Sequence, residues 1–411
     1  MISRFRTPRL VLAGLVLAAA VAAPHAFAAD SKSDSKNEDK IRAELAKPMT
    51  DAQQALQQKN WSEAMAKLAE ADAAKDKTPY EIYMINRMRG VAANGSGDMA
   101  GASKYFGAAI DTGKMLPQEQ QDLEADLVQA FIRAKDYPDM AAWAQRYIKS
   151  GGTSQSVRSA LALAEFNTGD VAGAARDLQA QIAAAEQAGQ KPPEQPLTLL
   201  ANCYDKQKDE ANYMRAVEKL VTDYPKPEYW VSLLSHVTGN ARLSDQLLVN
   251  VERLQRATGA LTSSNQYAMM VDLDLAEGIS SEAKSVADEG AGKGLVPKAT
   301  QAKADAAAAQ DRAKLDRDAK DAETFKDGNV LASIGYTYVG FGDYTKGIAA
   351  MQQAIAKGGL KHPEETKIEL GIAYYQAGQF PKAVETFNGI TGSGQAAQVA
   401  RYWAIKAKQG A

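Results

Sequence analysis

The side chains that most often carry out chemistry in enzymes are few in this sequence, and they are not grouped. The chain has three histidines and one cysteine. Neither His236 nor His362 has a neighbour at a spacing that suits metal binding or general-base catalysis. We expect His236 to be an ordinary surface residue, with a place in a binding groove as the alternative. Cys203 lies within an apolar helical run, which favours a buried small side chain over a nucleophile.

Two further patterns could carry chemistry, and neither is specific. Residues 290–294, GAGKG, are similar to a phosphate-binding loop, but no serine or threonine follows the lysine and no strand precedes it. We therefore expect a loop after a helix there. The acidic residues are scattered among lysines, as on solvated helix faces. The sequence predicts a protein that is not an enzyme and that needs no metal and no cofactor.

The N-terminus predicts export. Arg4, Arg6 and Arg9 accompany an apolar run over residues 10–23, and residues 26–28, AFA, match a small-x-small cleavage site. An uncleaved membrane anchor is the alternative, but the apolar run is shorter than the roughly 20 residues that span a bilayer. We expect residues 1–28 to be a signal peptide that directs the chain to the bacterial periplasm. Residues 29–44 then form a disordered leader, because they contain few large apolar side chains.

The charge of the chain gives no reason to expect binding to nucleic acid or to anionic lipid. The formal net charge is -2, and loss of residues 1–28, which hold three arginines and no acidic residue, would make it -5. No later segment is apolar enough to predict stable membrane insertion. A single cysteine allows no internal disulfide, so buried apolar surface must supply the stability.

The chain after the leader has the pattern of short helices. Alanine is abundant, apolar residues recur at intervals of three and four, and no run of alternating β-branched residues indicates a sheet. Prolines fall between these runs or in the first turn of one, where a helix tolerates them.

One stretch shows how the helices are expected to pair. In residues 370–387, LGIAYYQAGQFPKAVETF, the small residues Gly371 and Ala383 are flanked by the large residues Tyr374 and Phe387. Two antiparallel helices reach the usual separation of about 8–10 Å when small residues meet large ones at the contact. Gly378 supplies the turn between the two helices.

This stretch recurs along the chain. A close copy lies 36 residues earlier, with Gly335, Tyr338, Gly347 and Met351 in the corresponding places. Weaker copies give nine units, which begin at residues 45, 83, 121, 155, 194, 228, 264, 328 and 364. The starts are 34 to 39 residues apart, except for a gap of 64 before residue 328.

A period in the mid-thirties, made of two short helices, resembles the tetratricopeptide repeat (TPR) family. The resemblance covers roughly residues 45–395, although most units lack the tryptophan that is usual near the start of the first helix. It implies an all-α fold, a TPR-like α-solenoid in which antiparallel helix pairs form a superhelical array. A generic alanine-rich helical protein is the alternative.

The resemblance also implies a binding face. In TPR proteins the inner side of the first helix of each pair commonly holds an extended peptide or a helix of a partner. Projected onto this sequence, that side contains the residues Arg87, Asn94, Gln129, Arg133, Asn202, Lys206, Tyr336 and Tyr375. Amides can bond a peptide backbone, Arg and Lys can hold a carboxylate, and tyrosine offers a rigid surface with a polar tip.

The gap in the period divides the array into segments. The predicted organisation is a repeat block over 45–295, an alanine- and charge-rich helical spacer over 296–327, a pair of repeats over 328–395 and a capping helix over 396–411. The spacer is expected to be a long solvated helix held by propensity and charge pairs. A partner-binding arm is the alternative.

Together these patterns predict a non-catalytic periplasmic scaffold or adaptor that binds a protein or peptide of the cell envelope. Two alternatives stay open at this point. One is a carrier or accessory enzyme of cell-wall or transport machinery, with the segment 296–327 as an active part. The other is a structural module whose repeats assemble between chains.

Overall fold

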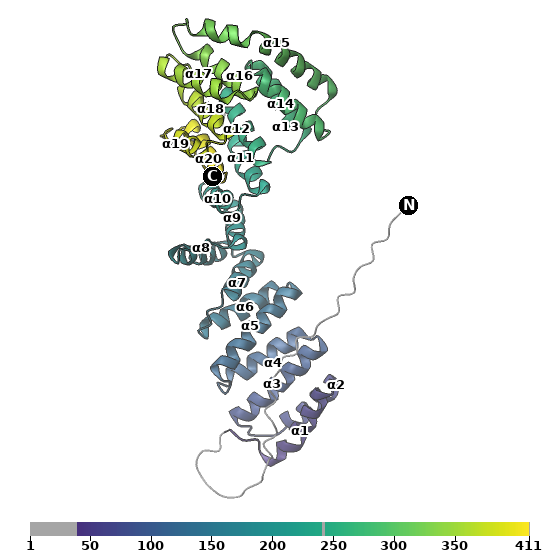
Figure 1. Ribbon diagram of the computed structural model, residues 1–411. Coiled ribbons are helices and arrows are strands. Elements are labelled where there is room, and N and C mark those ends of the chain that lie inside the picture. The colour runs from purple at the N-terminus through teal and green to yellow at the C-terminus, as the bar shows by residue number, and fades with distance from the viewer. Residues whose placement is uncertain (1–38, 241–242, 411) are drawn as a thin grey trace, which may run out of the picture. The chain divides into compact units, whose positions relative to one another are not determined.

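The computed structural model describes residues 39–240 and 243–410, and within these ranges the chain forms helices and no strand (Figure 1). The chain divides into two compact units between Leu161 and Ala162. The predicted signal peptide and most of the predicted leader lie outside the described residues. The first helix begins at Ala43, just before the end of that leader.

The N-terminal unit consists of three helix pairs and the start of a seventh helix. Its helices are α1 (Ala43–Gln57), α2 (Trp61–Asp72), α3 (Pro79–Ser96), α4 (Met99–Asp111), α5 (Pro117–Ala134) and α6 (Tyr137–Lys149), followed by α7 (Gln155–Thr168), which extends across the division. The contacts join helices that are next to each other in the sequence, such as α1 and α2 or α3 and α4, or that are two apart, such as α1 and α3. We call the first helix of each pair helix A and the second helix B.

The C-terminal unit holds the other helices. They are α8 (Val171–Gln187), α9 (Glu194–Gln207), α10 (Glu210–Asp223), α11 (Pro227–Asn240), α12 (Asp245–Thr258), α13 (Ser264–Ala276), α14 (Ser280–Gly292), α15 (Lys298–Ala322), α16 (Asn329–Gly340), α17 (Tyr344–Lys357), α18 (Pro363–Gln376), α19 (Phe380–Asn388) and α20 (Gln395–Lys408). The predicted all-α array of antiparallel helix pairs is confirmed.

Most helix pairs are joined by the same turn. Helix A ends near a residue in the left-handed region, and helix B begins after an Asp or Asn side chain that accepts a hydrogen bond from a backbone N–H of the first turn. The turn recurs at Lys59-Asn60, Gly97-Asp98, Lys135-Asp136, Gly169-Asp170, Lys208-Asp209 and Gly342-Asp343. A local sequence feature therefore repeats in both units.

The small-to-large packing predicted from residues 370–387 is present between α18 and α19. A Cβ atom at Gly371 would lie 2.5 Å from Cε1 of Phe387, so only glycine lets this ring sit against the helix. Gly378 has a φ of +71° at the turn, a conformation that favours glycine. Ala383 is fully buried at the same contact.

The helix α15 is a packed part of the C-terminal unit. One side of it, with Ala304, Ala308, Leu315 and Ala322, is buried. Asp305 and Asp311 accept hydrogen bonds from Lys284 and Ser280 of α14, and Asp316 accepts one at 2.7 Å from the Tyr338 hydroxyl of α16. The helix bridges α14 and α16, so the prediction of a helix held mainly by solvent-exposed charges is wrong for this side.

The last helices fold back within the C-terminal unit, which the period of the sequence does not predict. The helices α18 and α20 both pack against α12, and α20 also contacts α10. The Trp403 indole N–H donates to the backbone oxygen of Asn250 at 3.0 Å, and the Gln409 amide donates to that of Val221 at 2.8 Å. The C-terminal helix therefore packs on the final repeat and also ties it to helices more than 150 residues earlier.

Candidate functional site

Two of the predicted groove residues of the N-terminal unit come together. Asn94 of α3 and Arg133 of α5 line one small pocket of about 20 Å³, and Asp126 of α5 lies on its wall. The Arg133 side chain is exposed. Burial, with the nearby charge of Asp122, raises the pKa of Asp126. This pocket therefore joins polar side chains from the A helices of two consecutive repeats.

The other two predicted residues of this unit have different surroundings. Gln129 lies one turn before Arg133 on α5 and is partly buried. The guanidinium of Arg87 forms an ion pair with Glu119 at 2.7 Å. Arg87 therefore links α3 to α5 and is less available to a partner than Arg133.

In the C-terminal unit, Asn202 and Lys206 lie one turn apart on α9 and are both exposed. The Lys206 ammonium sits 4.0 Å from the centroid of the Phe166 ring, a cation–π contact that orients the side chain. These two residues form a polar surface on one helix.

The last two predicted residues do not lie in an open groove. Tyr336 is only 1% exposed, and the guanidinium of Arg253 lies 3.9 Å from the centroid of its ring. Tyr375 is partly buried and meets Trp403 edge to face at 5.6 Å. The prediction that Tyr336 lies on an open helix-A face is wrong, because α16 packs against α14 and α18 packs against α12. Its ring instead belongs to the lining of a pocket between these helices.

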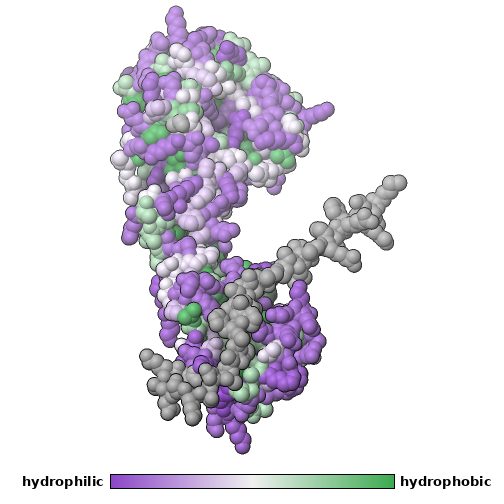
Figure 2. All heavy atoms as spheres, turned by 60° about the horizontal axis from the view of Figure 1, so that its bottom comes forward, coloured by the Kyte–Doolittle hydropathy of each residue, from purple (hydrophilic) through white to green (hydrophobic). Residues whose placement is uncertain are grey.

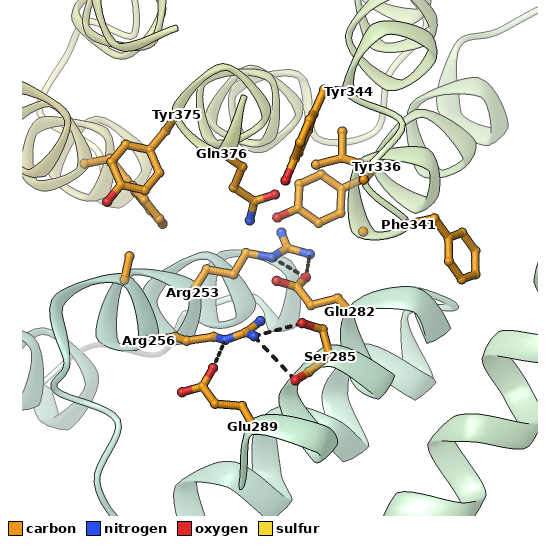
Figure 3. Close-up of a pocket in the computed structure, with 15 residues that line it drawn as sticks. Arg253, Arg256, Glu282, Ser285, Glu289, Tyr336, Phe341, Tyr344, Tyr375 and Gln376 are labelled. Carbon is orange, nitrogen blue, oxygen red and sulfur yellow. Dashed lines mark hydrogen bonds and ion pairs between the residues drawn. The ribbon is translucent and has the colours of Figure 1, made fainter. Parts of the chain in front are cut away.

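A larger pocket, of about 600 Å³, lies where these helices meet (Figure 3). It combines two arginines and two glutamates with several aromatic rings. The charged residues are Arg253, Arg256, Glu282 and Glu289, and the aromatic residues are Tyr336, Phe341, Tyr344, Tyr375 and Trp403. The charged residues come from α12 and α14, and the aromatic ones come from the C-terminal helices α16, α18 and α20 and from the turn and first residue of α17.

The arginines of this pocket are both neutralised by glutamates. Arg253 donates to Glu282 from Nε at 2.7 Å, and its side chain is only 2% exposed. Its Nη1 donates to Asn250 at 2.8 Å and lies 3.5 Å from Glu369 of α18. A buried charge needs such partners, because removing it from water costs several kcal/mol.

The second arginine lies nearer to solvent. Arg256 donates to Glu289 at 2.6 Å and to the Ser285 hydroxyl at 2.9 Å. Burial opposes ionisation of Glu289, but hydrogen bonds from Lys293, Tyr267 and Arg256 lower its pKa to about 2. Glu289 is therefore a carboxylate at every physiological pH.

Two more carboxyl groups belong to the same buried region. Glu252 of α12 and Asp274 of α13 are 1% and 0% exposed, and their side-chain oxygens have no hydrogen-bond partner among the described residues. Burial raises the pKa of Glu252 to about 7, with Glu282 adding to the effect and Arg253 opposing it. Burial also raises the pKa of Asp274 well above its usual range.

The sequence prediction did not include this cluster. Arg253, Glu282 and Glu369 lie in different repeats, up to 116 residues apart, so no local spacing links them. One indication was available in the weak repeat that begins at residue 228. Its helix α12 buries Asn250, Glu252 and Arg253 beside Leu247 and Val251, and such charged positions do not fit an apolar repeat core.

The residues that the sequence offered as candidates for chemistry lie apart from one another in the described part of the chain. Across residues 39–240 and 243–410 no group of three His, Cys, Asp or Glu side chains could hold a metal ion. Cys203 is buried, as predicted, and burial raises the pKa of its thiol to about 11, which makes it a poor nucleophile. His236 contacts Glu210 at 2.6 Å. Gly290 and Gly292 belong to the last turn of α14 rather than to a phosphate loop.

The visible surface offers no broad apolar face. Figure 2 shows a mostly hydrophilic face with small, separate apolar patches. The large apolar side chains that are exposed in the described ranges are Leu116, Val231, Met269, Phe325 and Val330. None of the described helices is long and apolar enough to cross a membrane.

Comparisons with known proteins give distant matches among solved structures. No protein-family model and no curated protein matches this sequence. Similar solved structures include a tetratricopeptide repeat protein from Parabacteroides merdae, at 10% identity and a TM-score of 0.29, with 81% of this chain and 99% of that chain covered. The TPR2AB domain of yeast Sti1, in a pHSP90 complex, is 13% identical at a TM-score of 0.26, with 70% of this chain and 98% of that chain covered. Yeast Tom70 is 10% identical at a TM-score of 0.23, with 89% of this chain and 96% of that chain covered. At these scores the likeness does not transfer a binding site.

Proposed function

We propose that this protein is a non-catalytic scaffold that binds a protein or peptide partner through the helix-A face of its N-terminal unit. The observation that carries the proposal is the convergence of Asn94, Asp126 and Arg133 on one pocket between α3 and α5. Side chains that repeat along such a face can bond an extended peptide at intervals.

The polar side chains of this face suit binding to a polar segment of a partner. The Asn94 amide can both donate to and accept from a peptide backbone, and the exposed Arg133 can hold a carboxylate with two parallel hydrogen bonds. Gln129, one turn away, extends the surface along α5. Arg87 contributes by holding α3 and α5 in register through Glu119.

Site-specific photocrosslinking tests this proposal. A photoreactive residue in place of Arg133 is expected to give one discrete adduct with an envelope protein in living cells. The matched control replaces Lys104, an exposed residue of α4 in the same unit but on a B helix. An identical set of adducts from both positions, or none from either, would contradict binding through the helix-A face.

The location in the bacterial periplasm is part of the same proposal. It is supported by the basic residues, the apolar run and the AFA site within residues 1–28. N-terminal sequencing of the protein recovered from a periplasmic fraction is expected to begin at Ala29. A chain that keeps Met1 and stays with the cytoplasmic fraction would overturn this location while leaving the binding face untouched.

A further inference from the structure

The pocket between α12, α14, α16 and α18 has the properties of a ligand site. Its volume of about 600 Å³ lies within the range of roughly 300–1,000 Å³ that is usual for small-molecule sites. The hydroxyl of Tyr336, 1% exposed, has no hydrogen-bond partner in the described part of the chain. Buried hydroxyls are nearly always hydrogen-bonded, so a ligand group at this position would recover a bond that the protein does not supply.

The charges of the pocket favour a neutral ligand. Arg253 is neutralised by Glu282, and Arg256 is neutralised by Glu289, so the four charged side chains of the lining sum to zero. A phosphate or an ammonium group would bring a charge without a free partner into a partly desolvated space, which is costly. Both carboxylates would also repel an anion.

The remaining polar groups of the lining can both donate and accept. In Figure 3, Tyr336, Tyr344 and Gln376 point toward Arg253 from the opposite wall. Neither the Tyr344 hydroxyl nor the Gln376 amide hydrogen-bonds to another described residue, and each offers a donor and an acceptor. Hydroxyl groups match such partners, because a hydroxyl also donates and accepts.

The aromatic side chains add flat apolar surface. Tyr344 and Tyr375 are partly buried in the wall, and Tyr375 is held by its edge-to-face contact with Trp403. We propose that this pocket binds a neutral saccharide ring, whose hydroxyls bond Tyr336, Tyr344 and Gln376 while a C–H face packs on an aromatic ring. This site is separate from the proposed peptide-binding face and does not depend on it.

The shape of the site favours a sugar ring over a peptide. Successive side chains of an extended peptide point in opposite directions, which suits a long groove along several helices. The pocket is instead confined to the place where α12, α14, α16, α18, α20 and the start of α17 meet. A short neutral peptide therefore serves as the contrasting ligand in the experiment.

Isothermal titration calorimetry of the mature chain tests the proposal. The ligands are glucose, maltose and N-acetylglucosamine, with glucose 6-phosphate and glucosamine as charged comparators and an N-acetylated, amidated Gly-Asn-Gly peptide as the contrast. At least one neutral sugar is expected to bind with a Kd below about 1 mM, and about tenfold more tightly than its charged relatives. No heat from any neutral sugar, or tighter binding of the peptide, overturns the proposal.

Two variants connect the signal to the pocket. Tyr336→Phe keeps the ring on Arg253 and removes only the unpartnered hydroxyl, so sugar affinity is expected to fall about tenfold while the urea midpoint stays unchanged. Gln376→Ala, at an exposed position, is expected to weaken binding in the same direction. The control Tyr105→Phe removes a hydroxyl from α4 and is expected to change neither. Wild-type affinity in both pocket variants contradicts the assignment.

Discussion

The helix-A faces of the two units differ in their exposure to solvent. In the N-terminal unit, Arg133 of α5 is exposed, and the helices contact others that are one or two places away in the sequence. In the C-terminal unit, Tyr336 of α16 and Glu369 of α18 are buried against helices from much earlier in the chain. Arg133 faces solvent, whereas Tyr336 and Glu369 both contact Arg253 of the chain's own helix α12.

This difference shows that a repeat position does not determine the environment of its side chain. The same projection along helix A selected Arg133 and Tyr336, and both units build their helix pairs from the same turn and the same small-to-large packing. The two units differ in contacts between distant segments, above all the ion pairs of Arg253 with Glu282 and Glu369. Changes to those contacts should affect one unit and spare the other.

The largest effect is expected from Arg253→Ala. This change leaves Glu282 and Glu369 buried without their cation, a loss that typically costs about 3–5 kcal/mol. Urea unfolding measures the loss, and hydrogen exchange should place it in α12, α14 and α18. Arg133→Gln, at an exposed site, is the control and should stay within about 0.5 kcal/mol of the wild type. Equal stability of the two variants would mean that the buried pairs do not hold the returning helices.

An effect of similar size is expected from Phe387→Ala and from Phe106→Ala. Each ring packs against a glycine of the preceding helix, Gly371 or Gly90, and each truncation is expected to cost about 3–5 kcal/mol. Phe387 also stacks on Trp403 at 5.8 Å, so its loss should raise hydrogen exchange in α20 and α12 as well as in α18. Phe106 also lines the pocket beside α5, so Phe106→Ala should raise exchange in α3, α4 and α5. Spread of that effect into the C-terminal unit would contradict packing that is confined to nearby helices in the N-terminal unit.

The sequence predicts those parts of the fold in which the packing involves helices adjacent in the sequence. Gly371, Ala383 and Phe387 specify a helix pair within 17 residues, and the repeat period then places one pair beside the next. The same period projected Asn94 and Arg133 onto one side, and the structure places them at one pocket. Their role in binding stays a prediction.

The part that escaped prediction depends on pairs of residues far apart. Trp403 bonds to the backbone of Asn250, and Arg253 meets Glu369, across 153 and 116 residues. A repeat period indicates which helix comes next along the chain, and it carries no information on where the chain turns back. Tyr336 was therefore assigned to a surface that these contacts bury.

Ionisation of the buried carboxyl groups should make the stability of the C-terminal unit depend on pH. The folded-state pKa of Glu252, about 7, lies above the unfolded value of roughly 4.3, so its contribution is present at low pH and is lost as the pH rises through 7. Asp274, faced by Glu252, Glu282, Arg253 and Arg256, acts in the same direction. The free energy of unfolding of the C-terminal unit should fall by about 3 kcal/mol between pH 5 and pH 8.

The measurement is a series of urea titrations across this pH range. Glu252→Gln, alone and with Asp274→Asn, should flatten the dependence because neither replacement ionises. Glu364→Gln, which changes an exposed carboxyl group on α18, should leave the curve unchanged. A wild-type curve that rises from pH 5 to pH 8 would show that these groups are ionised in the folded protein.

The smallest effect concerns the turns that the two units share. Asp98 in the N-terminal unit and Asp209 in the C-terminal unit each accept a hydrogen bond from a backbone N–H in the first turn of the next helix. Replacing either residue by alanine should cost about 1 kcal/mol, the usual loss for such a cap. Equal losses in urea titrations would locate the difference between the units in the long-range contacts of Arg253 and Trp403. A much larger loss for Asp209→Ala would instead show that the returning helices depend on local turn geometry.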